Sequence, residues 1–323
     1  MTPLLSATGL TKHFPVLGGP LGISKVGMVR AVDEVDLTVG RGEVLGLVGE
    51  SGCGKSTLGR LLIRLLDPTA GSVEFDGTDV ATAEGAALQA LRRRFQMIFQ
   101  DPYGSLNPRM RVDELVTEPL RLAGRSRREC RERAPQLLAM VGLAPEHGAR
   151  YAHQFSGGQR QRIGIARALA LDPALVVCDE PVSALDVSVQ GQVVNLLRDL
   201  QRERGLSYVF VSHDLRIVRH IADRVAVMYL GRIVEVGDKE TIYRQPLHPY
   251  TEALLAAVPM PKPGRPRRRA QVQGEIPSPL NPPNGCPFHP RCSLATDRCR
   301  AERPVLRSVA GRDVACHVAD GRV

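Results

Sequence analysis

A glycine-rich stretch, GESGCGKST at residues 49–57, has the composition of a phosphate-binding loop. It fits the pattern G-x-x-x-x-G-K-S/T and lies between an apolar run that predicts a strand and STLGRLLIRLL, whose apolar residues have helical spacing. In this context, backbone N–H groups and the N-terminal end of the helix attract phosphate oxygens. Lys55 would reach the β- and γ-phosphates, and the Ser56 hydroxyl would ligate Mg²⁺. The predicted nucleotide-binding residues are Gly49, Glu50, Ser51, Gly52, Cys53, Gly54, Lys55, Ser56 and Thr57.

A pair of carboxylates follows a second apolar run, LVVCDE at residues 175–180. Asp179 is placed to hold Mg²⁺ through water, and Glu180 to polarise an attacking water molecule. A strand that ends in two surface acids is the alternative, but the phosphate-binding loop favours catalysis. The two motifs together predict hydrolysis of a nucleoside triphosphate. Cys178 and Cys53 are interpreted as local packing residues.

The segments around these motifs predict an α/β fold. Apolar runs at 31–49, 71–77, 174–180, 207–214 and 224–238 read as strands, with a turn at Gly40–Gly42 and a hairpin at Gly231. Residues 102–171 have helical patterning, and 15–30 read as a loop. The strands at 174–180 and 207–214 each follow a helix-like segment, which favours a parallel sheet. No long internal repeat is visible, so we expect a single nucleotide-binding unit.

Composition narrows the class of protein. The 323 residues are 43% hydrophobic and 24% charged, as in ordinary globular proteins, with a net charge of +9. No apolar run approaches about 18 residues, and the N-terminus has no secretory pattern, so we expect a cytoplasmic protein that meets a membrane only through a partner. Disulfides are then disfavoured. The basic runs 121–133 and 264–269 are interpreted as a solvated helix face and a linker rather than a nucleic-acid surface.

A second anion site is predicted in FSGGQRQR at 155–162, where a hydroxyl and backbone N–H groups precede a helix-like segment. This motif resembles the signature of ABC-type ATPases, in which leucine is usual where this chain has Phe155. The resemblance implies that the signature of one subunit closes over the ATP held by another, so that two ATPs lie between two subunits. The residues expected to contact ATP in this way are Ser156, Gly157, Gly158 and Gln159.

Further segments resemble the same family in the same order. Gln100 in MIFQDP looks like the Q-loop glutamine, which senses Mg²⁺ or water and links to the transport subunit. Asp186 of SALD is expected at the subunit boundary, and His213 of VSHD is expected to contact the γ-phosphate. Phe14 in TKHF is the candidate for stacking on adenine. The resemblance therefore implies Glu180, His213 and Gln100 as catalytic residues, and Ser56, Gln100 and Asp179 as Mg²⁺ ligands.

The resemblance extends to one branch of the family. FQDPYGSLNPRM, PVSALDVSVQGQVVNLL, YLGRIVEVGDKETIY and PLHPYTEALLAAVP look like the ATPase subunits of oligopeptide and dipeptide importers. This implies a P-loop (RecA-like) parallel core, an antiparallel β subdomain and an inserted helical subdomain at about 102–171. The nucleotide-binding domain is expected at 1–257, and a small Cys-rich C-terminal extension at 258–323.

The same resemblance implies partners and a transport cycle. The partners are a second, paralogous ATPase subunit, two transmembrane permease subunits and an extracytoplasmic peptide-binding protein, with the chain at the cytoplasmic face of the membrane and no nucleic-acid partner. ATP would close the ATPase pair, residues 102–171 would transmit closure to the permeases, and hydrolysis would reopen the pair. Nickel or another small solute is the alternative cargo.

Two other function classes fit less well. A soluble ABC ATPase of nucleic-acid repair or translation usually carries a long insertion or tandem ATPase halves, whereas only about 100 residues separate Lys55 from Ser156 here. A phosphate-loop kinase of small molecules would not need the SGGQ and SALD segments.

Four of the seven cysteines lie in the last 38 residues: Cys286, Cys292, Cys299 and Cys316. Their spacing, C-x₅-C-x₆-C-x₁₆-C, contains no close pair of the kind usual at zinc sites. Wider spacing suits an iron–sulfur cluster. GCPFHPRC and ACH resemble the extension of the peptide-importer branch, in which some members bind 4Fe–4S. The prediction is a 4Fe–4S cluster, with zinc or reduced thiols as alternatives and His289 and His317 as alternative ligands.

Overall fold

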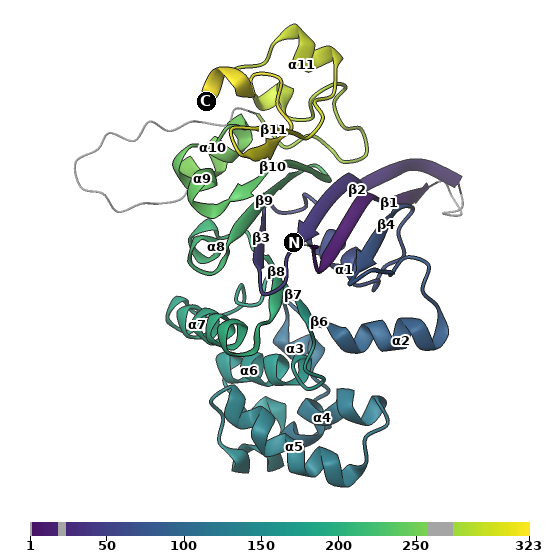
Figure 1. Cartoon of the computed structure of the whole chain (residues 1–323), viewed down its shortest axis with the longest axis vertical. Helices are drawn as coiled ribbons and strands as arrows, with labels where there is room; N and C mark the ends of the chain where they lie inside the picture. Colours follow the sequence, from purple (N-terminus) through teal and green to yellow (C-terminus); the bar gives the residue numbers. More distant parts are fainter. Residues whose placement is uncertain (1, 19–23, 258–273) are drawn as a thin grey trace, which may run out of the picture. The chain divides into compact units, whose positions relative to one another are not determined.

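The computed structural model describes residues 2–18, 24–257 and 274–323, which form two compact units (Figure 1). Unit 1 comprises Met1–Leu4, Val39–Val44 and Thr82–Ser212. Unit 2 comprises Leu5–Thr38, Leu45–Ala81 and His213–Val323. The basic run 264–269, which was predicted to be a linker, lies outside the described residues, and the described part of the chain stops at the predicted domain boundary after residue 257.

Unit 1 contains the predicted parallel strands. β6 (Phe95–Ile98), β7 (Leu175–Asp179) and β8 (Ser207–Val211) lie in the order β8-β7-β6, and both pairings are parallel. Every residue of β7 and β8 is buried, which explains why their sequences are continuous apolar runs. The helices α2 (Gly85–Arg94), α6 (Gly157–Ala168) and α7 (Val187–Arg204) precede β6, β7 and β8 respectively. The prediction of parallel strands joined through helices is confirmed.

The stretch predicted to be helical at 102–171 is helical. It contains α3 (Pro102–Ser105), α4 (Val112–Leu122), α5 (Arg127–Met140), the 3₁₀ turns η1 (Pro145–Ala149) and η2 (Ala152–Gln154), and α6. α5 starts at a capping box in which Ser126 and Glu129 each accept the other's backbone N–H. The basic run 121–133 falls on α4 and α5, where exposed arginines pair with glutamates one turn away, as in Arg128–Glu132.

Unit 2 contains a mixed sheet in the order β11-β12-β10-β9-β3, built from β3 (Val44–Val48), β9 (Arg224–Tyr229), β10 (Arg232–Asp238), β11 (Arg307–Val309) and β12 (Arg312–Val314). β3 pairs parallel with β9, and the other pairings are antiparallel. The predicted hairpin is β9–β10. Leu230 and Gly231 both have positive φ there, of 43° and 80°, which is the backbone geometry of a tight hairpin turn.

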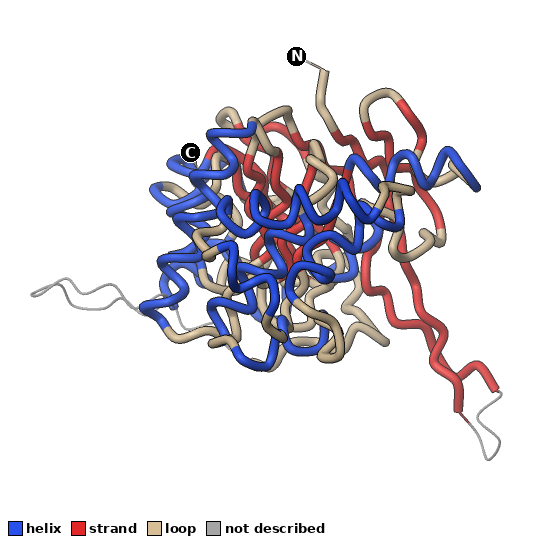
Figure 2. Tube along the Cα trace, turned by 90° about the horizontal axis from the view of Figure 1, so that it is seen from below, coloured by secondary structure: helices blue, strands red, loops and turns tan. Residues whose placement is uncertain are grey.

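A second sheet of unit 2 has the order β2-β1-β4-β5, from β1 (Leu5–Gly18), β2 (Ser24–Val39), β4 (Ala70–Phe75) and β5 (Thr78–Asp79). The prediction of a loop over 15–30 was wrong for the described part of that range. β1 continues to Gly18 and β2 begins at Ser24, and Figure 2 shows the two strands running side by side. Neighbouring strands satisfy each other's backbone groups, which a sequence pattern read one segment at a time does not reveal.

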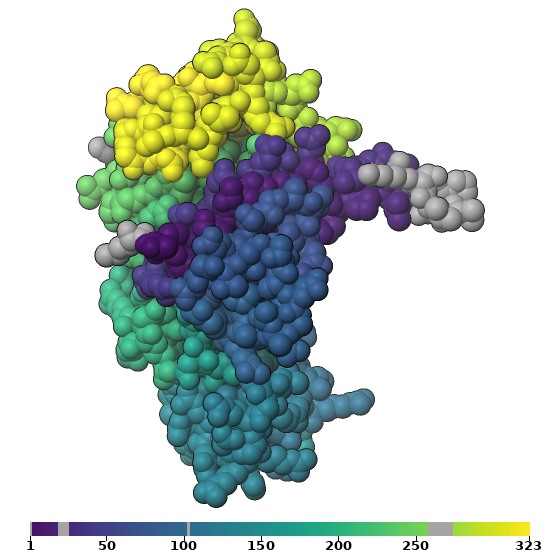
Figure 3. All heavy atoms as spheres, turned by 45° about the vertical axis from the view of Figure 1, so that its right-hand side comes forward, coloured from purple at the N-terminus to yellow at the C-terminus, as the bar shows by residue number. Residues whose placement is uncertain are grey.

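The remaining helices of unit 2 are α1 (Lys55–Leu62), α8 (Leu215–Ile221), α9 (Lys239–Arg244) and α10 (Pro249–Ala257). The C-terminal segment, residues 274–323, adds η3 (His289–Arg291), α11 (Asp297–Ala301), β11, β12 and η4 (Ala319–Arg322). Figure 3 shows its yellow residues massed beside the green residues that precede it in the chain. Leu247, Val309, Val314, Cys316 and Ala319 form a small apolar core here. No helix in the described ranges is long and apolar enough to cross a bilayer.

Candidate active site

The phosphate-binding loop, residues 49–57, lies between β3 and α1 as predicted. Gly54 is the N-cap of α1 with φ of 109°, and a Cβ there would lie 2.0 Å from the carbonyl oxygen of Ala31. A Cβ on Gly49 would lie 2.2 Å from the carbonyl oxygen of Met228. Only glycine can therefore bring this backbone so close to β2 and β9.

Lys55 closes the loop on itself. Its Nζ donates to the carbonyl oxygens of Gly49 and Glu50, at 2.9 Å each, and its side chain is buried. Cys53 is also buried, burial raises the pKa of its thiol, and its carbonyl oxygen accepts the N–H of Gly231. These contacts support the prediction that Cys53 is a packing residue.

The carboxylate predicted to act on water lies in unit 1. Asp179 ends β7 and is 1% exposed, and Glu180 follows it with φ of 45°. Positive φ is uncommon for a residue with a Cβ and occurs often at functional sites. The Glu180 N–H donates to the carbonyl oxygen of Val211, and Gln100 Nε2 donates to Glu180 Oε2 at 3.0 Å. The structure thus brings together two of the three predicted catalytic side chains.

The signature segment begins a helix, as predicted. Ser156 is the N-cap of α6, its hydroxyl accepts the N–H of Gln159, and Gln159 Oε1 accepts the N–H of Ser156. Gly158 has a second role that sequence reasoning missed. A Cβ there would lie 2.4 Å from Cγ1 of Val189, so this glycine also lets α6 pack closely on α7. Phe155, the departure from the usual leucine, is buried with its ring edge-on to His147.

The other predicted residues lie at the ends of elements. Asp186 is the exposed N-cap of α7, and the loop before it is held by Gln190 Nε2, which donates to the carbonyl oxygens of Val182 and Leu185. His213 is exposed just before α8. Phe14 is half-buried on β1, with Lys12 Nζ 5.3 Å from its ring centroid. The loop 49–57, Phe14 and His213 belong to unit 2, whereas Gln100, Asp179, Glu180, Asp186 and the signature belong to unit 1.

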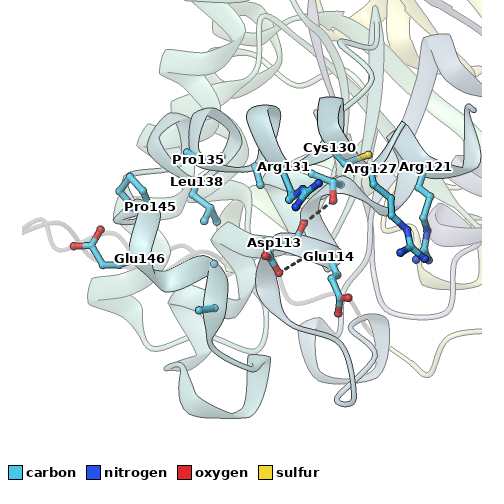
Figure 4. Close-up of a pocket in the computed structure, with 14 residues that line it drawn as sticks. Asp113, Glu114, Arg121, Arg127, Cys130, Arg131, Pro135, Leu138, Pro145 and Glu146 are labelled. Atoms are coloured by element: carbon cyan, nitrogen blue, oxygen red, sulfur yellow. Dashed lines mark hydrogen bonds between the residues drawn. The ribbon is translucent and has the colours of Figure 1, made fainter. Parts of the chain in front are cut away.

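Unit 1 also contains a cavity of about 550 Å³ between α4, α5 and η1 (Figure 4). Its polar lining has both signs of charge, with Asp113, Glu114 and Glu146 opposed by arginines. None of the predicted site residues lines it.

The four C-terminal cysteines line one cavity in unit 2. This thiol cavity is small, about 10 Å³, which is near the minimum that admits a water molecule. A Cβ on Gly285 would lie 2.4 Å from the carbonyl oxygen of Cys299, and the Cys286 N–H donates to the same oxygen at 2.8 Å. The complete lining is His248, Pro249, Cys286, Phe288, His289, Cys292, Cys299, Cys316, His317 and Val318.

Burial sets the protonation of the thiol cavity. It raises the pKa of Cys286 to about 11 and also raises that of Cys292 and Cys316, so these sulfurs are held as neutral thiols. His289 Nδ1 is 3.0 Å from the carbonyl oxygen of Cys286, to which it can only donate, which leaves Nε2 as the free ring nitrogen. Across the described ranges, no three His, Cys, Asp or Glu side chains are arranged as they stand to hold a metal ion.

Sequence reasoning missed two residues that hold the loop 49–57 in place. The Glu50 N–H donates to the Tyr250 hydroxyl at 2.8 Å, and the Glu50 carboxylate accepts two hydrogen bonds from Arg291. Arg291 lies in HPRC, where the sequence indicated only Cys292 and, as an alternative ligand, His289. Its separation from Glu50 by 241 positions left no local signal.

Comparison with known families decides which ATPases this chain resembles. Residues 32–183 match the ABC transporter family, and residues 234–299 match the C-terminal region of oligopeptide/dipeptide transporters. A probable peptide ABC transporter ATP-binding protein of Sinorhizobium fredii is 57% identical over 317 residues, which is 98% of this chain and 90% of that protein. The chain belongs to the family of peptide ABC transporter ATP-binding subunits.

Other members of this peptide ABC ATPase family are similarly close. The dipeptide transport ATP-binding protein of Escherichia coli is 52% identical over 319 residues, which is 98% of this chain and 95% of that protein. Among solved structures, a dimeric ATP-binding cassette bound to ADP and Pi has a TM-score of 0.64 at 29% identity, covering 73% of this chain and 98% of that one. The predicted ABC ATPase fold, with its antiparallel β and helical subdomains, is confirmed.

Proposed function

We propose that this chain is the ATP-hydrolysing subunit of an ABC importer of di- and oligopeptides. The observation that carries the proposal is the match of residues 234–299 to the C-terminal region of oligopeptide/dipeptide transporters, in a chain that already has an ABC transporter match at 32–183. ABC ATPases in general use ATP and Mg²⁺, whereas the second match narrows the cargo to peptides. Dipeptide transport in the name of the E. coli relative supports the same cargo.

The proposed chemistry assigns each predicted residue a task. Lys55 binds the β- and γ-phosphates, and Ser56, Asp179 and Gln100 hold Mg²⁺ directly or through water. Glu180 orients the attacking water, with Gln100 holding its carboxylate at 3.0 Å. His213 binds the γ-phosphate and Phe14 stacks on adenine. The signature of a second subunit, Ser156 to Gln159, completes the site with the helix N-terminus of α6, together with Asp186 at the boundary.

The proposed assembly has a paralogous second ATPase subunit, two permease subunits and an extracytoplasmic peptide-binding protein, at the cytoplasmic face of the membrane. A dimeric ATP-binding cassette among the similar structures supports the pairing of two ATPases. The proposed route of coupling runs through α3 to α6, next to Gln100 in the chain. Binding of nucleic acid has no place in this assignment.

Copurification and peptide uptake test the function together. A tagged chain extracted from membranes should bring two permeases and a second ATPase with it, and reconstituted vesicles that contain the peptide-binding protein should take up labelled dipeptide when ATP is supplied. The Lys55→Ala variant should assemble equally well and take up none. Uptake of nickel in place of dipeptide would show that nickel is the cargo. Retention of the chain on nucleic acid at moderate salt, without permeases, would overturn the assignment as a transporter subunit.

We also propose that the thiol cavity holds a 4Fe–4S cluster through Cys286, Cys292, Cys299 and Cys316. The donor set supports this, because four thiolates are the ligands that such clusters take and all four sulfur-bearing residues line one cavity. A bound cluster would stabilise the C-terminal segment by joining four places in the chain, and its iron charge would favour the thiolate forms. The cavity would have to widen to admit it.

Anaerobic purification tests the cluster. We expect broad absorbance near 400 nm with about four irons per chain, and loss of both in the Cys292→Ser variant. One zinc atom per chain would show that the cavity is a zinc site and not a cluster site. Free thiols with no metal would overturn both metal assignments. The Cys130→Ser variant is a matched control, because Cys130 is a buried cysteine on α5 of unit 1.

A further inference from the structure

Arg291 joins the C-terminal segment to the phosphate-binding loop. Its Nη1 and Nη2 donate to the two carboxylate oxygens of Glu50 at 2.8 and 3.0 Å, in the paired geometry that makes arginine–carboxylate contacts strong. The Arg291 side chain is 6% exposed and that of Glu50 is 26% exposed, so water screens the pair little. The Glu50 carbonyl oxygen in turn accepts from Lys55 Nζ. Arg291 therefore acts on the residue that positions the phosphate-binding lysine.

Arg291 also lies within the cysteine framework. It ends η3, which lies within the five residues between Cys286 and Cys292. Consecutive turns link this stretch: the N–H groups of His289, Arg291 and Cys292 donate to the carbonyl oxygens of Cys286, Phe288 and His289 respectively. These hydrogen bonds provide a continuous backbone connection from either cysteine to Arg291, along which a shift at a cysteine would be transmitted to the guanidinium.

An aromatic cluster of Tyr229, His248, Tyr250 and Phe288 fills the space between the thiol cavity and the loop. Phe288 and His248 line the thiol cavity. The Arg291 guanidinium lies 5.9 Å from the ring centroid of Phe288 and 5.8 Å from that of Tyr229. Tyr250 accepts the Glu50 N–H. Two continuous sets of contacts thus lead from the thiol cavity to Glu50, and both can respond to a change at the sulfur atoms.

We propose that Arg291 is a positioning residue that couples the thiol cavity to ATP binding. A ligand or covalent group at the cavity sulfurs shifts the stretch 286–292 and alters the two hydrogen bonds from Arg291 to Glu50. This change alters the affinity of the loop 49–57 for ATP. Coupling between two binding sites is reciprocal, so ATP must change the affinity of the cavity for that ligand by the same factor. The proposal rests on the proposed function only in that the loop 49–57 binds ATP. It gives the C-terminal segment a regulatory role in addition to any structural one.

Alkylation of a cavity thiol supplies a test that needs no metal. The purified full chain, freed of any metal with a chelator, is treated with iodoacetamide, in which a cysteine thiolate displaces iodide. Peptide mapping follows the rate at half-buried Cys292 with and without ATP and Mg²⁺. Peptide mapping separates this site from Cys53, which ATP could shield directly. We expect ATP to change the Cys292 alkylation rate at least about 5-fold, and alkylation of Cys292 to change ATP affinity at least about 5-fold. The two factors need not be equal, because one is a ratio of rates and the other a ratio of equilibrium constants.

Variants then assign the coupling to Arg291. Arg291→Met keeps the apolar length of the side chain and removes the guanidinium. In this variant ATP should change the Cys292 rate by less than about 2-fold, and alkylation of Cys292 should change ATP affinity by less than about 2-fold. Arg291→Lys restores the charge without the paired hydrogen bonds and should restore part of the coupling. Arg298→Met, which removes a surface pair with Glu302 in the same segment, should leave the coupling intact.

The outcomes separate the two proposals. If the wild-type chain binds ATP and the Cys292 rate does not respond, or responds equally in Arg291→Met, the coupling is overturned and the function stands. If the wild-type chain does not bind ATP, the proposed function itself fails and the coupling fails with it. If Arg291→Met does not fold, the wild-type reciprocity and Arg291→Lys decide the matter.

Discussion

The side-chain amide of Gln100 donates a hydrogen bond of 3.0 Å to the carboxylate of Glu180, although 80 positions separate them in the chain. Gln100 follows β6 and Glu180 follows β7, and these strands pair in parallel, with Ile98 opposite Cys178. Parallel pairing brings the carboxyl ends of neighbouring strands to one edge of the sheet. The two side chains predicted to respond to the transport subunits and to orient water are thereby in direct contact.

The Glu180→Gln variant should bind ATP normally and lose ATP hydrolysis by about 100-fold or more, because the amide cannot accept the proton of the attacking water. The ATP-bound dimer should then accumulate and be visible by light scattering or gel filtration. Gln96→Ala is the matched control. Gln96 lies on β6, but its side-chain amide donates to the carbonyl oxygen of Arg92 and not to a predicted catalytic residue. Normal steady-state hydrolysis in Glu180→Gln would remove Glu180 from the mechanism.

The Gly158→Ala variant should destabilise unit 1 by about 1–3 kcal/mol, because its Cβ would lie 2.4 Å from Cγ1 of Val189 and force α6 away from α7. Urea denaturation measures this change. Adding Val189→Ala should recover most of the loss. In the same helix, a Cβ on Gly164 meets nothing within 4 Å, so Gly164→Ala should stabilise by up to about 1 kcal/mol. Equal effects at the two glycines would contradict the packing role of Gly158.

The stability of unit 2 should fall with acidification because of His248. Burial, aided by the charge of Arg322, lowers the pKa of His248 to about 3, whereas the unfolded imidazole titrates near its ordinary value of about 6.5. Between these values only the unfolded state binds the proton, so stability is complete above about pH 6.5 and declines as pH falls toward 3, by about 1.4 kcal/mol per pH unit.

His248→Asn tests this dependence. His248 Nδ1 accepts the Tyr250 N–H at 3.0 Å, and the asparagine oxygen can accept the same hydrogen bond without titrating. Denaturation at pH 7 and pH 5 should show about 2 kcal/mol less acid destabilisation in the variant than in the wild type. Identical pH dependence in the two proteins would mean that His248 is not buried as a neutral ring.

The Arg312→Met variant should cost about 3–5 kcal/mol in unit 2, because it leaves the fully buried carboxylate of Glu235 without its cation, 3.6 Å away. Glu235 also accepts the N–H groups of Leu247 and His248 at the start of α10, so the loss should spread to the thiol cavity. Urea denaturation and protease sensitivity of the C-terminal segment measure it. Arg298→Met, which breaks an exposed pair with Glu302, should leave both unchanged.

The sequence alone determined the motifs that are local in the chain and the elements that they join. GESGCGKST, LVVCDE and FSGGQRQR each place their reactive groups at the end of a strand or the start of a helix, and a nearest-neighbour pattern is sufficient to reveal that. The parallel strands, the helical stretch and the β9–β10 hairpin were predictable for the same reason. The extension of β1 and β2 over the supposed loop was not, because each strand is stabilised by its partner rather than by its own residues.

Tertiary structure decided which distant groups meet. The contact of Gln100 with Glu180 depends on parallel pairing, and that of Arg291 with Glu50 spans 241 positions. Four cysteines without a close pair in the sequence line one cavity, and Gly285 allows the backbone next to Cys286 to approach Cys299. Contacts of this kind arise from packing and backbone closeness, which composition and periodicity do not encode. The spacing of the cysteines suggested a metal site. Only the folded chain revealed that Arg291, which lies between two of these cysteines, contacts Glu50 of the phosphate-binding loop.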